Sequence, residues 1–377
     1  MPPERRTAEA SVEAVRNAQQ LTGFIDLPWE IYRDSPPWVP PLKTEVRDLL
    51  TEANPFWQHA ERELFLAVAD GRIVGRCAAV VDRAYNDFHH EKCGYFGFFE
   101  CVDDEKTAQA LLDAARTWLK DKGMSVMRGP ASPSFNEECG LLIEGFDDPP
   151  AIMMPYNPPY YSALLESAGL TKIKDLYSYL LISTDPIPKR IRYLAERVAK
   201  KEGVRIRSMR MARWEEELQI VRDIYNEAWE KNWGFTPMTP AELDLMAEKL
   251  KPIVDPEAIH FADVDGETVA FSILLPDVNQ ALRRLNGKLG LWGTLKFLYY
   301  YRKIDRVRLI TLGVRKAFRN RGLEVLLYRE AWLTARRKGW DGELGWILED
   351  NEKMNRGMQA MEGKLYKKYR IYERAIA

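Results

Sequence analysis

One short segment of the sequence combines a strand, a basic loop and the start of a helix. It runs Leu312-Gly-Val-Arg-Lys-Ala-Phe-Arg-Asn-Arg-Gly-Leu-Glu324. A phosphate can bind the free backbone N–H groups at a helix N-terminus, where the helix dipole also favours negative charge. Gly322 permits close approach of the backbone, and countercharge is available from Arg315, Lys316, Arg319 and Arg321. The segment therefore predicts a phosphate site, with a solvated basic turn as the alternative.

Carboxylates near the ends of predicted strands are candidates for acid–base chemistry. Glu349 and Asp350 follow a strand that ends in Trp346-Ile-Leu, and Glu100 lies on the corresponding strand of the first half. Such a group can act as a general base near neutral pH. Because Glu349, Asp350 and Asn351 also form a natural N-cap cluster, helix capping is the alternative role. Glu349 ranks first among these candidate bases.

A polar loop in the first half is a candidate substrate site. Asn136-Glu-Glu138 is followed by Met153-Met-Pro-Tyr-Asn-Pro-Pro-Tyr-Tyr161, a stretch rigid with proline and rich in aromatic rings. A turn that only packs its tyrosines is the alternative. The substrate-contacting residues expected here are Asn136, Glu137, Tyr156 and Asn157.

Composition and charge exclude several classes of protein. The 377 residues suffice for two domains of about 180 residues each. Fifty-five Lys+Arg against 56 Asp+Glu give a net charge of −1, so no nucleic-acid partner is expected. No apolar run reaches the roughly 18 residues that span a bilayer, and residues 1–20 lack the apolar segment of a secretory signal. Four cysteines without C-x-x-C spacing, and a His89-His90 pair near Cys93 without a fourth ligand, predict reduced thiols in a cytoplasmic protein with no metal site.

Two landmarks recur at nearly one spacing and indicate an internal duplication. Asp70-Gly71 and Asp265-Gly266 each separate two β-rich runs, a strong hairpin signal, at an offset of 195 positions. The segments from Asn157 to Gly169 and from Asn351 to Gly363 both read as an asparagine, a helix and a terminal glycine, at an offset of 194. Two independent matches of this kind favour a repeated unit over coincidence.

Each half runs helix, hairpin, strand, helix, strand, helix, which predicts an α/β fold with a mixed sheet and helices on both faces. We expect a first domain at 1–182, a basic helical linker at 183–202 and a second domain at 203–377. The central elements are predicted as strand 94–102 and helix 104–122 in the first half, and as strand 306–314, helix 322–338 and strand 342–348 in the second.

The pattern Val314-x-x-x-Phe318-Arg319-x-x-Gly322 resembles the acyl-CoA pyrophosphate loop of the GNAT superfamily of N-acyltransferases, whose core is Arg/Gln-x-x-Gly-x-Gly/Ala. The resemblance covers most of 203–377 and, more loosely, 20–182. It implies two tandem GNAT domains and acyl-CoA or acetyl-CoA as co-substrate. In this second half it implies cofactor contacts at Leu312, Gly313, Val314, Arg319, Asn320, Arg321, Gly322, Leu323, Glu324 and Asn351.

The sequence departs from the family pattern at three places. Glu324 stands where Gly or Ala is usual, and its charge would repel a pyrophosphate. Gln359 replaces a tyrosine that protonates the leaving thiolate in many members, so a catalytic tyrosine must come from elsewhere. The first half has Glu100-Cys-Val-Asp-Asp-Glu-Lys-Thr-Ala in place of the basic loop. We therefore expect a degenerate first domain and one CoA site per chain, with backbone N–H groups around Leu312 to Val314 meeting the oxyanion.

Residues 279–306 form a basic, aromatic insertion in the second half. Seven basic residues face one acid, Asp305, and apolar side chains recur every three or four positions. Gly287, Gly290 and Gly293 weaken a continuous helix, so two short helical segments are expected. The pattern is typical of a segment that contacts anionic lipid, which would place the protein at the inner face of a membrane. A helix docked on its own domain is the alternative.

The two-domain layout is similar to tandem GNAT proteins and to the bacterial ceramide synthase group, which N-acylates a long-chain amino alcohol. This resemblance implies an acyl-CoA-dependent N-acyltransferase that acts on a small-molecule or lipid-like amine. A non-catalytic GNAT-fold binding or regulatory protein is one alternative. Aminoacyl transfer from charged tRNA is another, although the sequence has no extended heptad run for the coiled arm of those enzymes.

Overall fold

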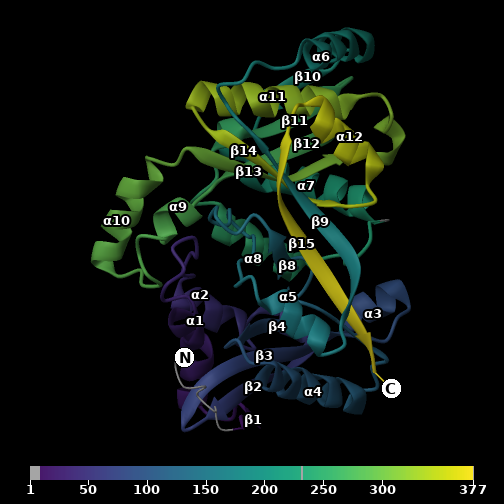
Figure 1. Cartoon of the computed structure of the whole chain (residues 1–377). Helices are drawn as coiled ribbons and strands as arrows, with labels where there is room; N and C mark the ends of the chain where they lie inside the picture. The colour runs from purple at the N-terminus through teal and green to yellow at the C-terminus, as the bar shows by residue number, and fades with distance from the viewer. Residues whose placement is uncertain (1–8, 231, 377) are drawn as a thin grey trace. The chain divides into compact units, whose positions relative to one another are not determined.

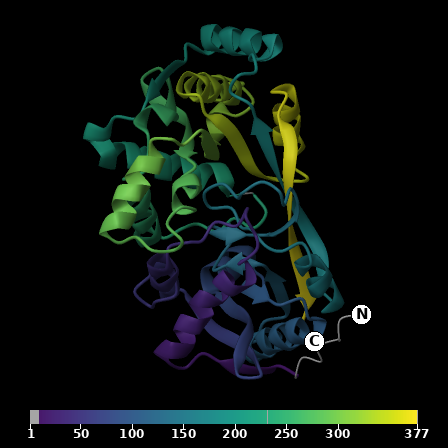
Figure 2. The ribbon, with the colours of Figure 1, turned by 60° about the vertical axis from the view of Figure 1, so that its left-hand side comes forward.

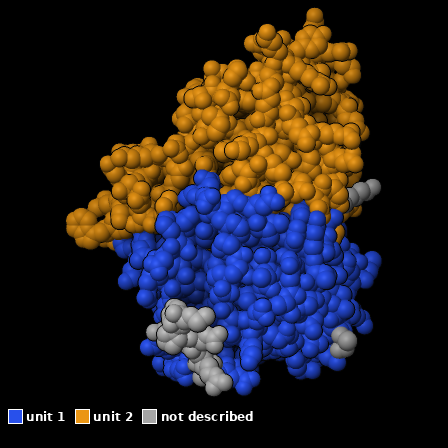
Figure 3. Space-filling model, in the orientation of Figure 1, with its two compact units in different colours: residues 1–175, 285–290, 369–377 blue, residues 176–284, 291–368 orange. Residues whose placement is uncertain are grey.

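The computed structural model describes residues 9–230 and 232–376. The first eight residues, which belong to the polar N-terminal segment, lie outside this range. The chain forms two compact units, shown in different colours in Figure 3. Unit 1 comprises residues 1–175, 285–290 and 369–377, and unit 2 comprises residues 176–284 and 291–368.

Unit 1 is built on a mixed sheet with a helix on each face (Figure 1). Its strands follow the order β1 (Ser11–Ala14), β2 (Ala60–Ala69), β3 (Arg72–Asp82), β4 (Cys93–Cys101) and β5 (Val126–Gly129). Only β4 and β5 pair in parallel. Helix α1 (Ala18–Ile31) packs on one face, and α4 (Glu105–Asp121) packs on the other. The remaining elements are α2 (Lys43–Leu49), η1 (Pro55–Gln58), α3 (Arg83–His89), β6 (Ala131–Ser132), β7 (Glu138–Cys139), β8 (Leu141–Glu144) and α5 (Tyr161–Ser167).

Unit 2 repeats this plan. Its sheet follows the order β10 (Arg205–Ser208), β11 (Ile259–Val264), β12 (Glu267–Pro276), β13 (Arg306–Val314) and β14 (Asp341–Leu348), and again only the last pair is parallel. Helix α11 (Leu323–Lys338) packs on one face, with α6 (Lys189–Glu202) against it, and α7 (Trp214–Trp229) packs on the other. The remaining elements are η2 (Met211–Arg213), α8 (Pro240–Leu250), η3 (Pro256–Ala258), α9 (Asn279–Leu282), α10 (Leu291–Tyr301), η4 (Lys316–Phe318) and α12 (Glu352–Ala360).

The two hairpins predicted from sequence are confirmed. At both Asp-Gly pairs the two turn residues have positive φ, with φ of 50° at Asp70 and Asp265 and of 73° and 86° at the glycines that follow. Asparagine, aspartate and glycine tolerate this left-handed conformation best, which is why the dipeptide marks the turn so reliably. The mixed sheet with helices on both faces is confirmed as well.

The units differ from the sequence halves in three segments. Strand β9 (Thr171–Leu181) begins in unit 1 and ends in unit 2, where it pairs with β14. Strand β15 (Lys364–Ala375) does the reverse, and its last residues pair with β5. Residues 285–290 belong to unit 1, because the Trp29 indole donates to Asn286 Oδ1 (2.9 Å) and the Lys43 amide donates to the Gly287 carbonyl (3.1 Å).

The insertion at 279–306 forms two short helices, as predicted, although Gly293 lies inside α10. Figures 1 and 2 show α10 at the outer edge of unit 2, away from the sheet of that unit. In the described part of the chain, no helix has the length and apolar character needed to cross a bilayer.

Candidate functional site

The parallel strands β13 and β14 of unit 2 pair along only part of their length. Arg306 to Leu309 pair with Asp341 to Leu344, and beyond Leu309 strand β13 keeps β12 as its hydrogen-bonded neighbour up to Val314. We call the point of separation, after Leu309 and Leu344, the unit 2 notch. The Arg308 guanidinium spans it and donates two hydrogen bonds to the Gly345 carbonyl, at 3.0 and 3.2 Å. The notch leaves one backbone edge of β13 without a strand partner.

The loop that follows β13 ends at an uncapped helix N-terminus. Asn320 and Gly322 have φ of 63° and 86°, and no side chain caps α11. A Cβ on Gly322 would lie 2.9 Å from Val198 Cγ2, so glycine is required by both conformation and space. Among the described residues, the backbone N–H groups of Asn320, Arg321 and Gly322 have no hydrogen-bond acceptor. These groups and the dipole of a 16-residue helix lie where the sequence predicts an anion site, which stays a prediction.

The basic side chains of this loop are engaged by unit 2 itself. Arg319 donates to the carbonyls of Glu227 and Ala228, both at 3.0 Å, and so caps the C-terminal end of α7. Arg321 pairs with Glu202 at 3.3 Å. The remaining loop cations also meet carboxylates, since Arg315 lies 3.5 Å from Glu227 and 3.3 Å from Glu267, and Lys316 pairs with Glu230. If the loop binds an anion, its backbone N–H groups are therefore more available for that role than its basic side chains.

The unusual Glu324 in the first turn of α11 has its own counter-ion. Lys353 on α12 donates to its carboxylate at 2.6 Å. This ion pair reduces the repulsion expected between Glu324 and a bound pyrophosphate. Sequence analysis missed Lys353, although its position two residues after Asn351 in a predicted helix was the available signal.

The residues after β14 lie at the start of α12. Asn351 is the N-cap, and its Oδ1 accepts from the Met354 amide at 3.2 Å. Glu349 is half-buried, its carbonyl accepts from Asn355 Nδ2 at 3.2 Å, and Asp350 is exposed. The helix-capping alternative therefore holds for Asn351, whereas a basic role for either carboxylate stays a prediction. In the described ranges, no three His, Cys, Asp or Glu side chains gather as a metal site.

A buried carboxylate that sequence analysis missed lies directly before the unit 2 notch. Glu343 on β14 is fully buried, and its Oε2 accepts a hydrogen bond from the Tyr366 hydroxyl on β15. Among residues 9–230 and 232–376, its other oxygen, Oε1, has no hydrogen-bond partner. The signal was a glutamate between Gly342 and Leu344 in a strand expected to be apolar.

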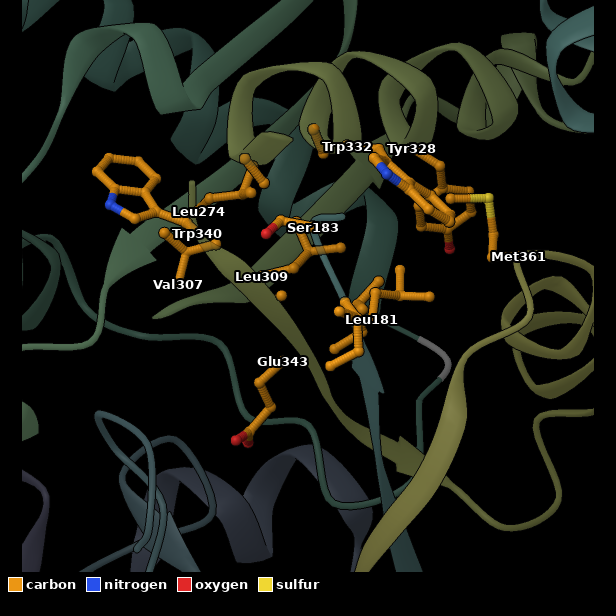
Figure 4. A pocket seen from close by; sticks show the side chains of 15 residues that line it. Leu181, Ser183, Leu274, Val307, Leu309, Tyr328, Trp332, Trp340, Glu343 and Met361 are labelled. Carbon is orange, nitrogen blue, oxygen red and sulfur yellow. The ribbon is translucent and has the colours of Figure 1, made fainter. Parts of the chain in front are cut away.

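An apolar pocket lies beneath α11 on the opposite face of the same strands (Figure 4). It encloses about 410 Å³, part of it open to solvent. Leu309 and Leu344, the last paired residues before the notch, contribute to its wall. The indole N–H of Trp332, also in the wall, finds no hydrogen-bond acceptor in the part of the chain that the structure describes. Figure 4 shows the Glu343 carboxylate pointing away from these apolar side chains. The sheet thus has an apolar face under α11 and a carboxylate on its other face.

The corresponding strands of unit 1, β4 and β5, pair only over Cys93 to Tyr95. The chain after β5 then stays against β4. A Cβ on Gly97 would lie 1.7 Å from the Ala131 carbonyl oxygen, and the Phe98 amide donates to Ser132 Oγ at 2.8 Å. Helix α4 begins directly afterwards, with the Asp104 carboxylate accepting from the Thr107 amide at 2.8 Å. We call this region the unit 1 notch, and its own chain fills it.

Glu100, a predicted base, lies at the centre of a buried polar cluster in unit 1. Its Oε2 accepts from the hydroxyls of Tyr32 (2.8 Å) and Tyr161 (2.7 Å), and Arg76 lies 3.5 Å from Oε1. Burial raises the pKa of Glu100, an effect that the Arg76 guanidinium opposes. Burial, together with the charge of Glu100, also holds the pKa values of both phenols well above the usual range.

The predicted acceptor residues of unit 1 have mainly structural contacts. The Asn157 amide is buried and braces Leu142, accepting from its amide at 2.7 Å and donating to its carbonyl at 3.1 Å. The Tyr156 carbonyl accepts from Tyr32 at 3.1 Å, which connects this loop to the Glu100 cluster. Asn136 and Glu137 are half-buried in a turn closed by Ser134. Their role toward a substrate stays a prediction.

Two curated proteins match the chain along nearly its whole length. It is 36% identical to the bacterial ceramide synthase of Caulobacter vibrioides over 100% of both chains. It is 37% identical to protein YghO of Escherichia coli over 97% of this chain and 95% of that protein. This chain belongs to the bacterial ceramide synthase family. No protein-family model matches it.

Solved structures place the fold of this bacterial ceramide synthase family member among the tandem GNAT proteins. A tandem GNAT protein from the clavulanic acid biosynthesis pathway superposes with a TM-score of 0.58 over 98% of this chain and 99% of its own, at 13% identity. A GCN5-related N-acetyltransferase from Sphaerobacter thermophilus gives a TM-score of 0.53 over 98% and 96%, at 15% identity. At such identities the likeness concerns the fold alone, and it confirms the tandem GNAT resemblance.

Proposed function

We propose that this chain transfers an acyl group from a CoA thioester to the primary amine of a long-chain amino alcohol. The observation that carries the proposal is the 36% identity to a bacterial ceramide synthase over both full lengths. The GNAT-like fold supports the thioester donor, and the uncapped N-terminus of α11 provides a place for the pyrophosphate. The product is an N-acylated lipid.

In this proposal, unit 2 alone binds the donor. The N–H groups of residues 320–322 hold the pyrophosphate, and the thioester lies along the edge of β13 beyond Leu309, where Leu312 and Val314 offer backbone groups to the oxyanion. Leu323 and Glu324 form the first turn beneath the phosphates, and Asn351 shapes the neighbouring start of α12. Unit 1 is degenerate as a donor site, because residues 131–132 occupy the edge of β4.

The test is release of free thiol from acetyl-, octanoyl- and palmitoyl-CoA, with and without long-chain amino alcohols, spermidine and amino acids. We expect release that requires both a long-chain donor and a long-chain amino alcohol. Release with acetyl-CoA as the only active donor would keep the N-acyltransferase activity and exclude the lipid substrates. If folded protein released no thiol with any donor and acceptor, the proposed function would be overturned.

The second part of the proposal is that α10 contacts an anionic bilayer. Apolar side chains along this helix are half or more exposed, with Trp292 at 81% and Leu291 at 80%. The basic side chains around them are exposed too: Arg283, Arg284, Lys288, Lys296, Arg302 and Lys303. An exposed Trp- and Leu-rich face flanked by cations fits the headgroup region of anionic phospholipid. This surface would let a membrane-resident lipid amine reach the enzyme.

Liposome flotation tests the bilayer contact. Trp292→Ser combined with Leu295→Ser should abolish flotation with vesicles containing phosphatidylglycerol. Leu333→Ser removes a similarly exposed leucine from α11 and should leave it unchanged. These point variants are preferable to deletion of the insertion, because residues 285–290 belong to unit 1. Equal flotation of all variants, or equal binding to neutral vesicles, would exclude the contact.

A further inference from the structure

The unpartnered oxygen of Glu343 lowers the stability of the fold, which indicates a functional reason for this glutamate. A buried polar atom without a partner destabilises a fold, and more strongly if it is charged. Glu343 is fully buried, yet its Oε1 accepts no hydrogen bond within the described part of the chain. An apolar residue at this strand position would avoid the cost. A group that supplies a proton to Oε1 during function would account for the glutamate.

The position of Glu343 relates it to the proposed thioester site. It directly precedes Leu344, the last residue of β14 that pairs with β13 before the unit 2 notch. Side chains alternate along a strand, so Glu343 and Leu344 point to opposite faces. Glu343 is one of the residues that line the apolar pocket under α11, but Figure 4 shows its carboxylate directed away from the apolar side chains there. The carboxylate thus lies on the side of the sheet opposite α11, at the level where the two strands begin to separate.

One side chain holds this carboxylate, and a second holds the backbone beside it. The Tyr366 hydroxyl donates to Oε2 and leaves Oε1 as the available acceptor. Arg308 on β13 lies opposite Glu343 in the parallel register. Its guanidinium donates to the Gly345 carbonyl on β14 and so connects the two strands where their backbone pairing ends. Together these contacts hold the Glu343 side chain and the backbone of the notch in one arrangement.

We propose that Glu343 is the catalytic base for the acceptor amine, with Tyr366 as a positioning residue. This inference rests on the proposed function. Oε1 removes one proton from the ammonium, and the nitrogen lone pair attacks the thioester carbon. A C–N bond forms, the C–S bond breaks, and its electrons go to sulfur. The proton lost by nitrogen in the tetrahedral intermediate goes to the thiolate, so amide and free thiol leave, and Glu343 returns its proton to water.

The experiment compares Glu343→Gln with wild type in the thiol-release assay, using two acceptors. One is a long-chain amino alcohol, which is protonated at neutral pH. The other is a long-chain alkoxyamine, a much weaker base that is already unprotonated. We expect kcat with the amino alcohol to fall about 10²- to 10⁴-fold in Glu343→Gln, and kcat with the alkoxyamine to change far less. A role in folding alone would lower both rates equally.

Further variants make the outcome decisive. Tyr366→Phe should lower kcat with the amino alcohol by a smaller factor than Glu343→Gln does. Glu216→Gln changes an exposed glutamate on α7 and should match wild type with both acceptors. Wild-type rates in Glu343→Gln, an equal loss with both acceptors, or a larger selective loss in Glu349→Gln would overturn the assignment while the proposed function stands. An inactive wild type would instead overturn the proposed function, and the assignment with it.

Discussion

The two notches of this molecule begin alike and end differently. In each unit a parallel strand pair separates after a few residues, and a helix follows the inner strand. In unit 1 the chain after β5 stays against β4, and the next helix is capped by Asp104. In unit 2 strand β13 continues beside β12 alone, and α11 starts at Gly322 with no side-chain cap. The two units thus share one arrangement of strands and helix. In the described part of the chain, backbone groups at the notch stay available to a ligand in unit 2, whereas in unit 1 the chain itself covers them.

The polar groups of the two units differ in the same way. Unit 1 surrounds Glu100 with two phenols and a guanidinium, so both carboxylate oxygens have partners. Within the described part of the chain, Oε1 of Glu343 in unit 2 has no hydrogen-bond partner, and neither has Arg76 Nε in the Glu100 cluster of unit 1. The difference therefore concerns the two carboxylates: both oxygens of Glu100 have partners in unit 1, whereas Oε1 of Glu343 can still accept a hydrogen bond from a ligand.

The largest effect is expected from Gly97→Ala in unit 1. The new Cβ would lie 1.7 Å from the Ala131 carbonyl oxygen, so the chain that fills the notch must move. We expect a loss of about 3 kcal/mol in the free energy of unfolding, measured by urea denaturation. Gly357→Ala is the control, because no atom lies within 4 Å of its new Cβ, and alanine in helix α12 should stabilise by about 0.5–1 kcal/mol. Equal stability of Gly97→Ala and wild type would show that the unit 1 notch is not filled.

The next effect concerns the donor site of unit 2. Gly322→Asp gives α11 a carboxylate at its N-terminus, the arrangement that Asp104 gives α4. The carboxylate would compete for the N–H groups and repel the pyrophosphate, so we expect the Kd for CoA to rise about 100-fold, or about 2.7 kcal/mol. Gly322→Asn is the matched control, because it meets the same positive φ of 86° and the same Val198 contact without the negative charge. Calorimetric titration that finds equal CoA affinity for both variants would exclude the helix N-terminus as the phosphate site.

The units should also respond oppositely to acid. His260 lies buried between Ser272 (3.3 Å) and Thr334 (3.0 Å), and burial lowers its pKa to about 4. The unfolded chain binds this proton more tightly, at a pKa of about 6.5, so acidification favours unfolding of unit 2. Between pH 7.5 and 5 the contribution of His260 should fall by about 2 kcal/mol. In His260→Gln the stability, measured by urea denaturation across this range, should depend less on pH by that amount.

The contribution of Glu100 to stability depends on pH with the opposite sign. Its pKa is raised by burial, so its contribution to stability is fully present below the unfolded pKa and is lost as pH rises through the folded pKa. Glu100→Gln should therefore remove a stabilisation that wild type gains in acid. A steeper loss of stability in acid for wild type than for Glu100→Gln would contradict this sign.

Local patterns allowed much of the fold to be predicted. The Asp-Gly hairpins, the strand from Arg306 to Val314 and the helix that follows Gly322 depend on contacts close in sequence, and the structure has them at the expected places. Strand exchange was not predictable in this way. Whether β15 pairs in one unit or the other depends on partners far away in the sequence, such as Tyr372 with Gly129, which are 243 residues apart. The period-two hydrophobicity of the strand is the same in both cases.

The loop of the candidate site could be predicted from the sequence, but the partners of its side chains could not. Gly322 and the basic residues were visible as a motif, because each has a role that its residue type determines. The capping of α7 by Arg319, the pairing of Lys353 with Glu324 and the unpartnered oxygen of Glu343 depend on which elements meet in three dimensions. A charged residue inside an apolar strand was the one local signal that pointed to Glu343.

The smallest effect is expected from Asp104→Gly, which uncaps α4 in unit 1. Glycine replaces aspartate at an N-cap at a cost of only a few tenths of a kcal/mol, so the fold should persist. If an uncapped helix were sufficient for CoA binding, this variant would gain a second site. We expect none, because Ala131 and Ser132 still cover the edge of β4 on which a thioester would lie. CoA titration of the double variant Asp104→Gly, Gly322→Asp tests unit 1 by itself, because the proposed site of unit 2 is blocked. CoA binding by this variant would show that helix capping alone distinguishes the two notches. Absence of CoA binding would assign the difference to the filled strand edge.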